Sequence, residues 1–235
     1  MAIKTDTKEI MDTNWYFSTP VYSIMKPEFL DKAIKATDKF IDAAVKDKQK
    51  ELKDRKKWLG NKDYLKVKDH GMSYHSTPLN GDPGLKELEQ YIGATSLNLL
   101  EEWGYDMSKY SMFFTEFWVQ EFAKIGGGHH DTHVHWDNHI SGFYFLKCSD
   151  KTSYPVFHDP RAGAMMTKLP QKDKTKVTPM SDMINYRPQP GMLVFFPAYL
   201  PHQFTVDDGV DDFRFIHFNL QAVRNIITKS SKGNK

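Results

Sequence analysis

Residues 111–123 read Ser-Met-Phe-Phe-Thr-Glu-Phe-Trp-Val-Gln-Glu-Phe-Ala, and they carry the clearest evidence for the fold class. The side chains fall into two alternating sets with a period of two residues, which is typical of a β-strand because successive side chains point to opposite faces. Both alternating sets contain aromatic residues, so we expect this strand to be covered on both sides for part of its length. Before residue 111 apolar residues recur at helical spacing instead, so the chain changes there from helical to extended structure.

Further strands are expected after this stretch, and turns rich in glycine, proline and aspartate separate them. They lie at 141–147, 154–158, 192–196, 202–206 and 213–220. Several short strands with turns between them are typical of a β-sandwich or a β-barrel.

The chain before residue 111 is expected to support this β core. An early strand is predicted at 15–24, where aromatic and β-branched residues gather. Pro27 and Pro83 each precede an apolar stripe with helical spacing, and proline is favoured in the first turn of a helix. We therefore predict a mainly β chain with N-terminal helices (α+β) in a single domain over 1–235, with the strand and helices in 1–110 and the β core in 111–225.

The composition excludes several classes of protein. The net charge is only +2, which gives no reason to expect a nucleic-acid partner. A lone cysteine, Cys148, excludes an internal disulfide framework and a multi-cysteine metal site. The polar N-terminus and the lack of a stretch of roughly 20 apolar residues argue against a signal segment or a membrane span. We expect a cytoplasmic protein without a membrane partner, and a homodimer stays open.

The stretch from Gly126 to His139 holds five of the ten histidines. Residues two apart in a strand share a face, so His133, His135 and Asp137 are expected to project from one side. Two imidazoles and one carboxylate form the set of ligands that holds iron(II) and leaves positions open for substrate and oxygen. A solvated loop with incidental histidines is the alternative interpretation of this stretch.

Two later residues complete the predicted site. His202 follows an apolar strand and a turn, and it is the candidate for the distant metal ligand. Arg214 lies within an apolar strand, where an unpaired charge is costly to bury, so a bidentate carboxylate partner is expected. A dicarboxylate cosubstrate would provide one. The alternative partners are four nearby aspartates: Asp207, Asp208, Asp211 and Asp212.

These residues and their order resemble the iron(II)/2-oxoglutarate-dependent oxygenases of the double-stranded β-helix fold, which is jelly-roll or cupin-like. More narrowly, the chain resembles a family of this class in which a His-x-His segment runs into a Ser-Gly-x-Tyr-Tyr-like strand. Here these elements are His133-Val134-His135 and Ser141-Gly142-Phe143-Tyr144. The resemblance covers residues 111–220 and a short N-terminal piece, 17–22.

The resemblance implies roles for particular residues. His202 would be the distal metal ligand, and Arg214 would hold the far carboxylate of 2-oxoglutarate. We favour His135 with Asp137 as the proximal ligands, and His133 with His135 and His129 with Asp131 are the other registers. Ile216 stands where much of the superfamily has a serine that also contacts the cosubstrate. Tyr144 and Asn219 are further candidates for cosubstrate contacts.

The implied activity is that of a hydroxylase that uses Fe(II), 2-oxoglutarate and O2. Its pocket would be lined by residues among Trp118, Phe143, Phe145 and Phe195. A cupin-like metalloenzyme that does not use 2-oxoglutarate, with His133, His135 and His202 as ligands, is one alternative, and a non-catalytic binding module is another. The substrate stays open between a protein side chain, a small metabolite and a lipid-like molecule. The loop 161–188 is interpreted as a lid or as a hairpin insertion.

Overall fold

The computed structural model describes residues 3–4, 10–12, 14, 16–59, 73–166 and 169–225. Two long helices, α1 (Leu30–Leu59) and α2 (Lys86–Glu102), accompany short 3-10 turns at η1 (Pro27–Phe29) and η3 (Ala162–Met165). The strands are β1 (Ile3–Lys4), β2 (Ile10–Met11), β3 (Tyr22–Met25), β4 (Ser73–His75), β5 (Tyr110–Phe122), β6 (His130–His133), β7 (Ile140–Lys147), β8 (Pro155–His158), β9 (Met183–Asn185), β10 (Met192–Pro197), β11 (His202–Phe204) and β12 (Arg214–Arg224).

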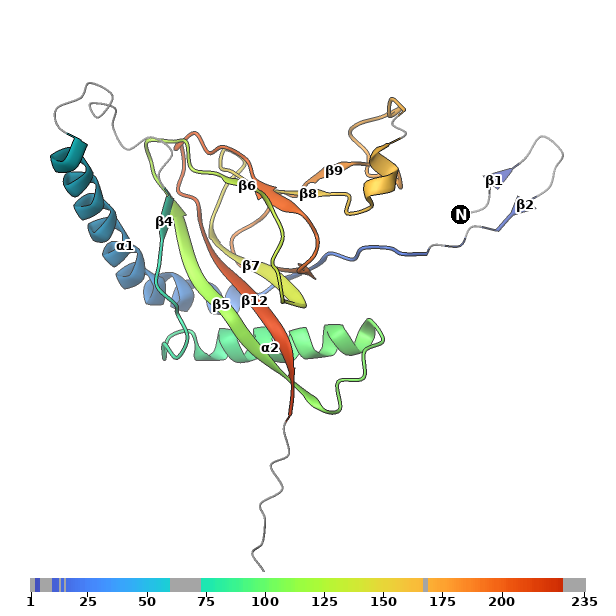
Figure 1. Ribbon diagram of the computed structural model, residues 1–235, viewed down its shortest axis with the longest axis horizontal. Helices are drawn as coiled ribbons and strands as arrows, with labels where there is room; N and C mark the ends of the chain where they lie inside the picture. Colours follow the sequence, from blue (N-terminus) through green and yellow to red (C-terminus); the bar gives the residue numbers. More distant parts are fainter. Residues whose placement is uncertain are drawn as a thin grey trace, which may run out of the picture.

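Two antiparallel sheets form the body of the protein (Figure 1). The larger has six strands in the order β3-β10-β7-β12-β5-β4, and the smaller has four in the order β6-β11-β8-β9. The long strands β5 and β12 pair over most of their length and make up the middle of the larger sheet with β7. The predicted mainly β structure with N-terminal helices is thereby confirmed, and the structure adds that the sheets are antiparallel.

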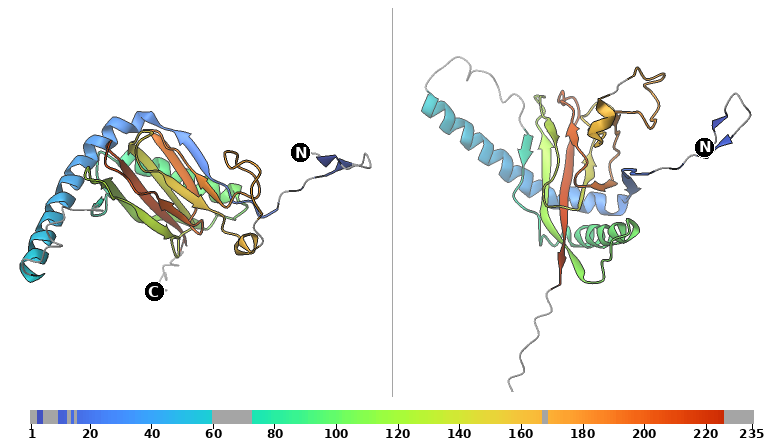
Figure 2. Two further views of the ribbon diagram at one scale, coloured as in Figure 1. Left: turned by 90° about the horizontal axis from the view of Figure 1, so that it is seen from above. Right: turned by 45° about the vertical axis from the view of Figure 1, so that its right-hand side comes forward.

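The helices α1 and α2 pack on one face of the six-stranded sheet, as the views in Figure 2 show. The apolar cluster on this face joins Ile41 of α1 and Ile92 of α2 to Ile216 and Phe218 of β12. Burial of the helices' apolar stripes against the sheet supplies much of their stability, since helical propensity alone is weak.

A second apolar cluster lies on the opposite face, between the two sheets, and phenylalanine dominates it. Its members come from both sheets: Phe122, Phe143, Phe145, Phe157, Val194, Phe196, Leu200, Phe204, Phe213 and Phe215. Because side chains alternate along a strand, Phe215 of β12 and Phe213 just before it face this interior while Ile216 and Phe218 face the helices. Both faces of the larger sheet are therefore covered, as the aromatic residues on both sides of β5 predicted.

Some boundaries differ from the predicted ones. The early strand is confined to β3, and the second helix begins at Lys86 rather than at Pro83. Asp82 accounts for the later start, because its carboxylate accepts the N–H of Gly84 at 2.8 Å and pairs with Lys39 of α1. Within 161–188 the described residues include η3 and β9, and β9 extends the smaller sheet by pairing with β8.

In the part of the chain that the structure describes, no helix combines the length and the apolar character needed to cross a bilayer.

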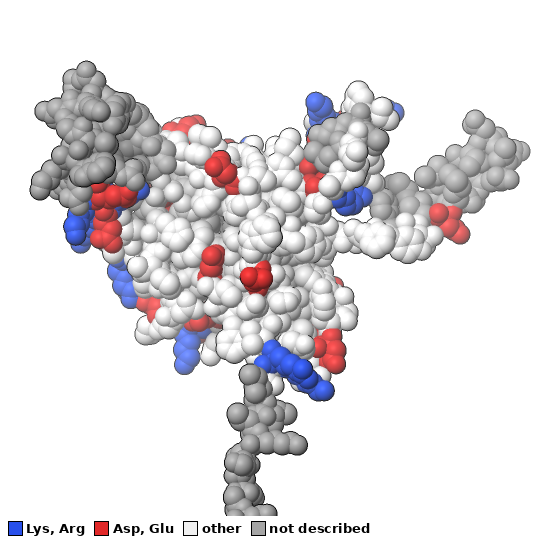
Figure 3. Space-filling model, viewed as in Figure 1, with Lys and Arg blue, Asp and Glu red and all other residues white. Residues whose placement is uncertain are grey.

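On the face shown in Figure 3, lysine and arginine lie toward the edges, and the charged side chains in its middle are acidic.

Candidate metal centre

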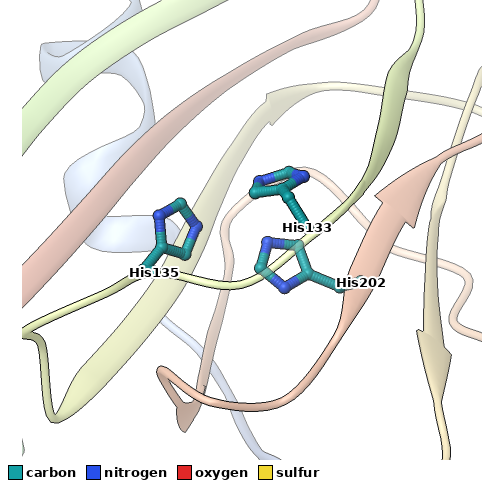
Figure 4. A group of neighbouring side chains, drawn as sticks. All are labelled: His133, His135 and His202. Atoms are coloured by element: carbon teal, nitrogen blue, oxygen red, sulfur yellow. The ribbon is translucent and has the colours of Figure 1, made fainter.

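Three histidines from separate turns and strands meet at one end of the smaller sheet (Figure 4). His133 ends β6 and His202 begins β11, and the antiparallel pairing sets these two residues directly opposite each other. His135 follows β6 in the turn, where its backbone N–H donates to the carbonyl oxygen of Ala198 at 3.0 Å. Strand pairing thus joins ligands that lie about 70 residues apart in the sequence.

The three rings are close enough to share one metal ion. One nitrogen of each ring lies within 4.8 Å of the corresponding nitrogens of the other two. The ring centroids are 4.5 Å apart for His133 and His202, 5.0 Å for His133 and His135, and 5.2 Å for His135 and His202. An ion with metal–nitrogen bonds of about 2.0–2.2 Å fits such a group after small side-chain rotations that bring the three nitrogens closer together.

The backbone orients two of the rings for metal binding. Nδ1–H of His133 donates to the carbonyl oxygen of Asp131 at 2.7 Å, and Nδ1–H of His202 donates to that of Leu200 at 2.9 Å. These bonds leave the Nε2 lone pairs of both rings free. Metal-binding histidines commonly show this arrangement, in which an acceptor holds the proton on the other ring nitrogen. Nε2 of His202 and of His135 are both buried without a hydrogen-bond partner, and a metal ion would satisfy them.

Burial keeps the imidazoles of His135 and His202 neutral. Desolvation lowers the pKa of His202 to about 2 and that of His135 to about 3, and in His135 the neighbouring His217 and His133 add to the effect. A neutral imidazole is the form that binds a metal ion, so these two rings are ready to act as ligands at neutral pH without losing a proton.

A second polar group adjoins the histidines and shares His135. It consists of Glu116, His135 and His217, whose candidate ligand atoms also lie within 4.8 Å of one another. The Asn219 amide nitrogen lies between two of them, donating to Glu116 Oε2 at 2.7 Å and lying 2.8 Å from His135 Nδ1. Asn219 bonds Glu116 and adjoins His135 within this group, whereas backbone carbonyls orient the rings of His133 and His202, so we assign the metal to the three histidines and a supporting role to this second group.

The carboxylate of Glu116 is ionised in this group. The interaction with His217, whose Nε2 lies 3.4 Å from Glu116 Oε2, holds the pKa of Glu116 down to about 2 despite partial burial. His217 itself is fully buried, and burial lowers its pKa. His217 and Asn219 are two residues apart on β12 and share a face, but nothing in the sequence showed that Glu116 of β5 joins them or that this face meets the histidines.

Asp137 does not lie where we expected it. The prediction assumed that the strand continues to residue 137, but β6 ends at His133 and the chain turns at Trp136 and Asp137. Asp137 has a left-handed backbone with φ of 59°, it is exposed, and it belongs to neither candidate metal group. His129 and Asp131 are also exposed, with 3.8 Å between His129 Nε2 and Asp131 Oδ1. Of the three registers, the structure brings together His133 and His135.

Arg214 lies on the other side of β12 from the histidines. Its guanidinium donates from Nε to Glu121 Oε2 and from Nη1 to Asp38 Oδ1, each at 2.6 Å. Asp38 belongs to α1, which packs on the outer face of the sheet. The expectation of a buried arginine with carboxylate partners holds, but the partners are neither a cosubstrate nor the four aspartates considered. The structure therefore does not place Arg214 at the metal centre.

Two other expected residues also lie away from the site. Tyr144 is buried on the helix-covered face, where its hydroxyl donates to the carbonyl oxygen of Lys26 at 2.8 Å. Phe195 belongs to the same face, whereas Phe143 and Phe145 lie between the sheets and Trp118 lies 4.6 Å from His217, ring to ring. Of the expected cosubstrate contacts, only Asn219 reaches the histidines.

Comparison with known families agrees with this geometry. Residues 116–219 match the model of the family described as "Putative 2OG-Fe(II) oxygenase". The matched segment is similar to the 2OG-Fe(II) oxygenase family, and it contains all three histidines and both members of the Glu116–Asn219 contact. No protein with a curated description matches the chain.

Solved structures of low sequence identity align with the fold. AviO1 from Streptomyces viridochromogenes aligns with a TM-score of 0.50 at 10% identity, over 86% of this chain and 90% of that one. A prolyl-4-hydroxylase from Pseudomonas putida aligns with a TM-score of 0.46 at 12% identity, over 89% and 94%. An oxidoreductase of the 2OG-Fe(II) oxygenase family from Burkholderia pseudomallei aligns with a TM-score of 0.41 at 12% identity, over 66% of this chain and 65% of that one.

Proposed function

We propose that this chain is an iron(II)-dependent oxygenase on a double-stranded β-helix, with the metal held by His133, His135 and His202. The observation that carries the proposal is the convergence of three imidazoles, two of which have a buried Nε2 without a partner. The family match of residues 116–219 supports iron as the metal. Iron(II) held in this way keeps open positions at which it supplies oxygen activation for the oxidation of a substrate C–H bond.

The chain's own residues would orient and isolate the metal. The carbonyl oxygens of Asp131 and Leu200 fix two of the ligand rings. Aromatic side chains exclude water on the inner side, since Phe196 lies 4.8 Å and Phe143 5.7 Å from the ring of His202, centroid to centroid. We propose hydroxylation as the reaction, with a protein side chain or a small molecule as substrate.

The cosubstrate of the family fits this site only in part. The chelating end of a 2-oxo acid suits the open positions of the metal. The far carboxylate of 2-oxoglutarate would need a cation, and Arg214 is on the other face, bound to Glu121 and Asp38. This placement also supports a second candidate function, a cupin-like oxygenase that uses the same three histidines without any 2-oxo acid.

An anaerobic metal titration tests the proposal. We expect one tight site for iron(II), or for cobalt(II) as a spectroscopic substitute, and a loss of at least about 100-fold in affinity in His133→Ala and His202→Ala. His129→Ala is the matched control, because His129 is exposed and lies in the same histidine-rich stretch. Asp137→Asn should leave the affinity unchanged, and a loss in this variant would instead favour His135 with Asp137 as ligands.

Adding a 2-oxo acid to the iron-loaded protein separates the two candidate functions. A visible charge-transfer band on its addition, followed by oxygen consumption with substrate, is expected for the 2-oxo-acid-dependent oxygenase. An iron-loaded protein that gives no such band with any 2-oxo acid would favour the cupin-like alternative.

A further inference from the structure

The position of Arg214 bears on the chemical class of the cosubstrate. Among the described residues it is the only buried lysine or arginine. Its two carboxylate partners, Glu121 and Asp38, already neutralise it and hold it toward α1. A rotation into the interior would break both ion pairs and would require β12 to reverse its alternation, because Phe213 and Phe215 occupy the inward positions on either side.

The inward positions beside the metal centre are aromatic rather than basic. Phe143 lies close to both His202 and His217, at 5.7 and 5.5 Å between ring centroids. Behind it, Phe204 and Phe215 stack at 4.5 Å. Phenylalanines make up most of the cluster between the sheets, and the one lysine or arginine that is buried among the described residues, Arg214, lies on the other face of β12. A carboxylate that entered this interior would lose its hydration without gaining a partner, which is strongly unfavourable.

The polar side of the centre is equally unsuited to a second carboxylate. The carboxylate of Glu116 lies against His135, His217 and Asn219. The unsatisfied amide oxygen of Asn219 is a further acceptor. An acceptor-rich surface repels an anion and favours groups that donate hydrogen bonds.

We propose that the metal centre binds a 2-oxo acid with an uncharged tail in place of the dicarboxylate 2-oxoglutarate. This inference rests on the proposed function, since it assumes that a 2-oxo acid chelates the metal. The tail would pack against the phenylalanines between the sheets, where apolar carbon gains from leaving water. Arg214 would then have a structural role, joining α1 to β12, and would not contact the cosubstrate.

The test compares 2-oxopentanoate with 2-oxoglutarate, because the two acids have the same five-carbon chain and differ in the terminal carboxylate. Each is titrated into the iron-loaded protein without oxygen, and the charge-transfer band reports the Kd. We expect 2-oxopentanoate to bind at least about tenfold more tightly. A Kd for 2-oxoglutarate equal to or below that of 2-oxopentanoate overturns the inference.

A variant of Arg214 provides an independent measurement. Arg214→Lys retains the positive charge and part of the ion pairing, so it should fold, and we expect it to leave both Kd values within about twofold of the parent. A selective loss of 2-oxoglutarate binding in this variant would overturn the inference. If iron binds stoichiometrically but neither acid gives a band, both this inference and the 2-oxo-acid-dependent function fail, while the metal site stands.

Discussion

Replacing Arg214 with methionine should destabilise the protein strongly, because Arg214 joins α1 to β12 in the interior. The side chain of Arg214 is only 6% exposed, and its partners Glu121 and Asp38 are 20% and 55% exposed. Removing one partner of a buried ion pair costs about 3–5 kcal/mol because the other charge stays buried. Here Asp38 can return to water and Glu121 keeps Lys147 at 3.8 Å, so we expect the lower end, about 3 kcal/mol.

This loss is measured by thermal denaturation of the metal-free protein at neutral pH. For a chain of this size, 1 kcal/mol shifts Tm by about 2–4 °C, so the variant should melt roughly 6–12 °C lower. Lys32→Met is the control, since Lys32 also pairs with a carboxylate, Glu87, but both side chains are exposed, at 51% and 65%. A surface pair is worth about 1 kcal/mol or less. A shift below about 2 °C for Arg214→Met would refute the structural role that we assign to it.

Three further predictions concern the metal centre and the sheet. Glu116→Gln should weaken metal binding by about 10–100-fold in a cobalt titration. The reason is that Glu116 lies 4.0 Å from Nδ1 of the proposed ligand His135, and a carboxylate beside a metal-binding imidazole orients its ring. Unchanged affinity would exclude this role. The metal-free protein should lose stability as pH falls below about 6.5, by up to about 3 kcal/mol per pH unit. His135 and His202 take up protons in the unfolded state, whereas in the folded state their pKa values of about 3 and 2 keep them unprotonated. Denaturation midpoints that stay constant from pH 7 to 5 would contradict this prediction. Gly142→Ala should prevent stable folding, because the new Cβ would lie 2.2 Å from the carbonyl oxygen of Val194 on the paired strand. A stable variant with an unchanged Tm would show instead that the two strands can move apart at this position.

The strands were largely predictable because their apolar residues repeat over many positions. The expected strands at 111–123 and 213–220 correspond closely to β5 and β12. The same regular pattern did not predict which face of β12 meets the metal centre, because both faces of this strand are buried and aromatic. The placement of Arg214 and Tyr144 on the outer face was therefore not readable from the pattern.

The metal ligands show the same division. The run of histidines and the later His202 are local features, and by themselves they indicate a metal site. Which of them share that site depends on contacts between distant segments. The pairing of β6 with β11 sets His133 opposite His202, and a left-handed residue at 137 directs the chain away before Asp137 can join them.

A pattern of side chains therefore specified the strands, the helices and the kind of ligand, since these follow from local preferences and from spacing along the chain. The tertiary structure alone decided that three imidazoles meet in one candidate metal group, that Glu116 and Asn219 adjoin this group, and that Arg214 lies outside it. The physical reason is that strand register and the stacking of two sheets set these positions, and both arise from packing between residues far apart in the sequence.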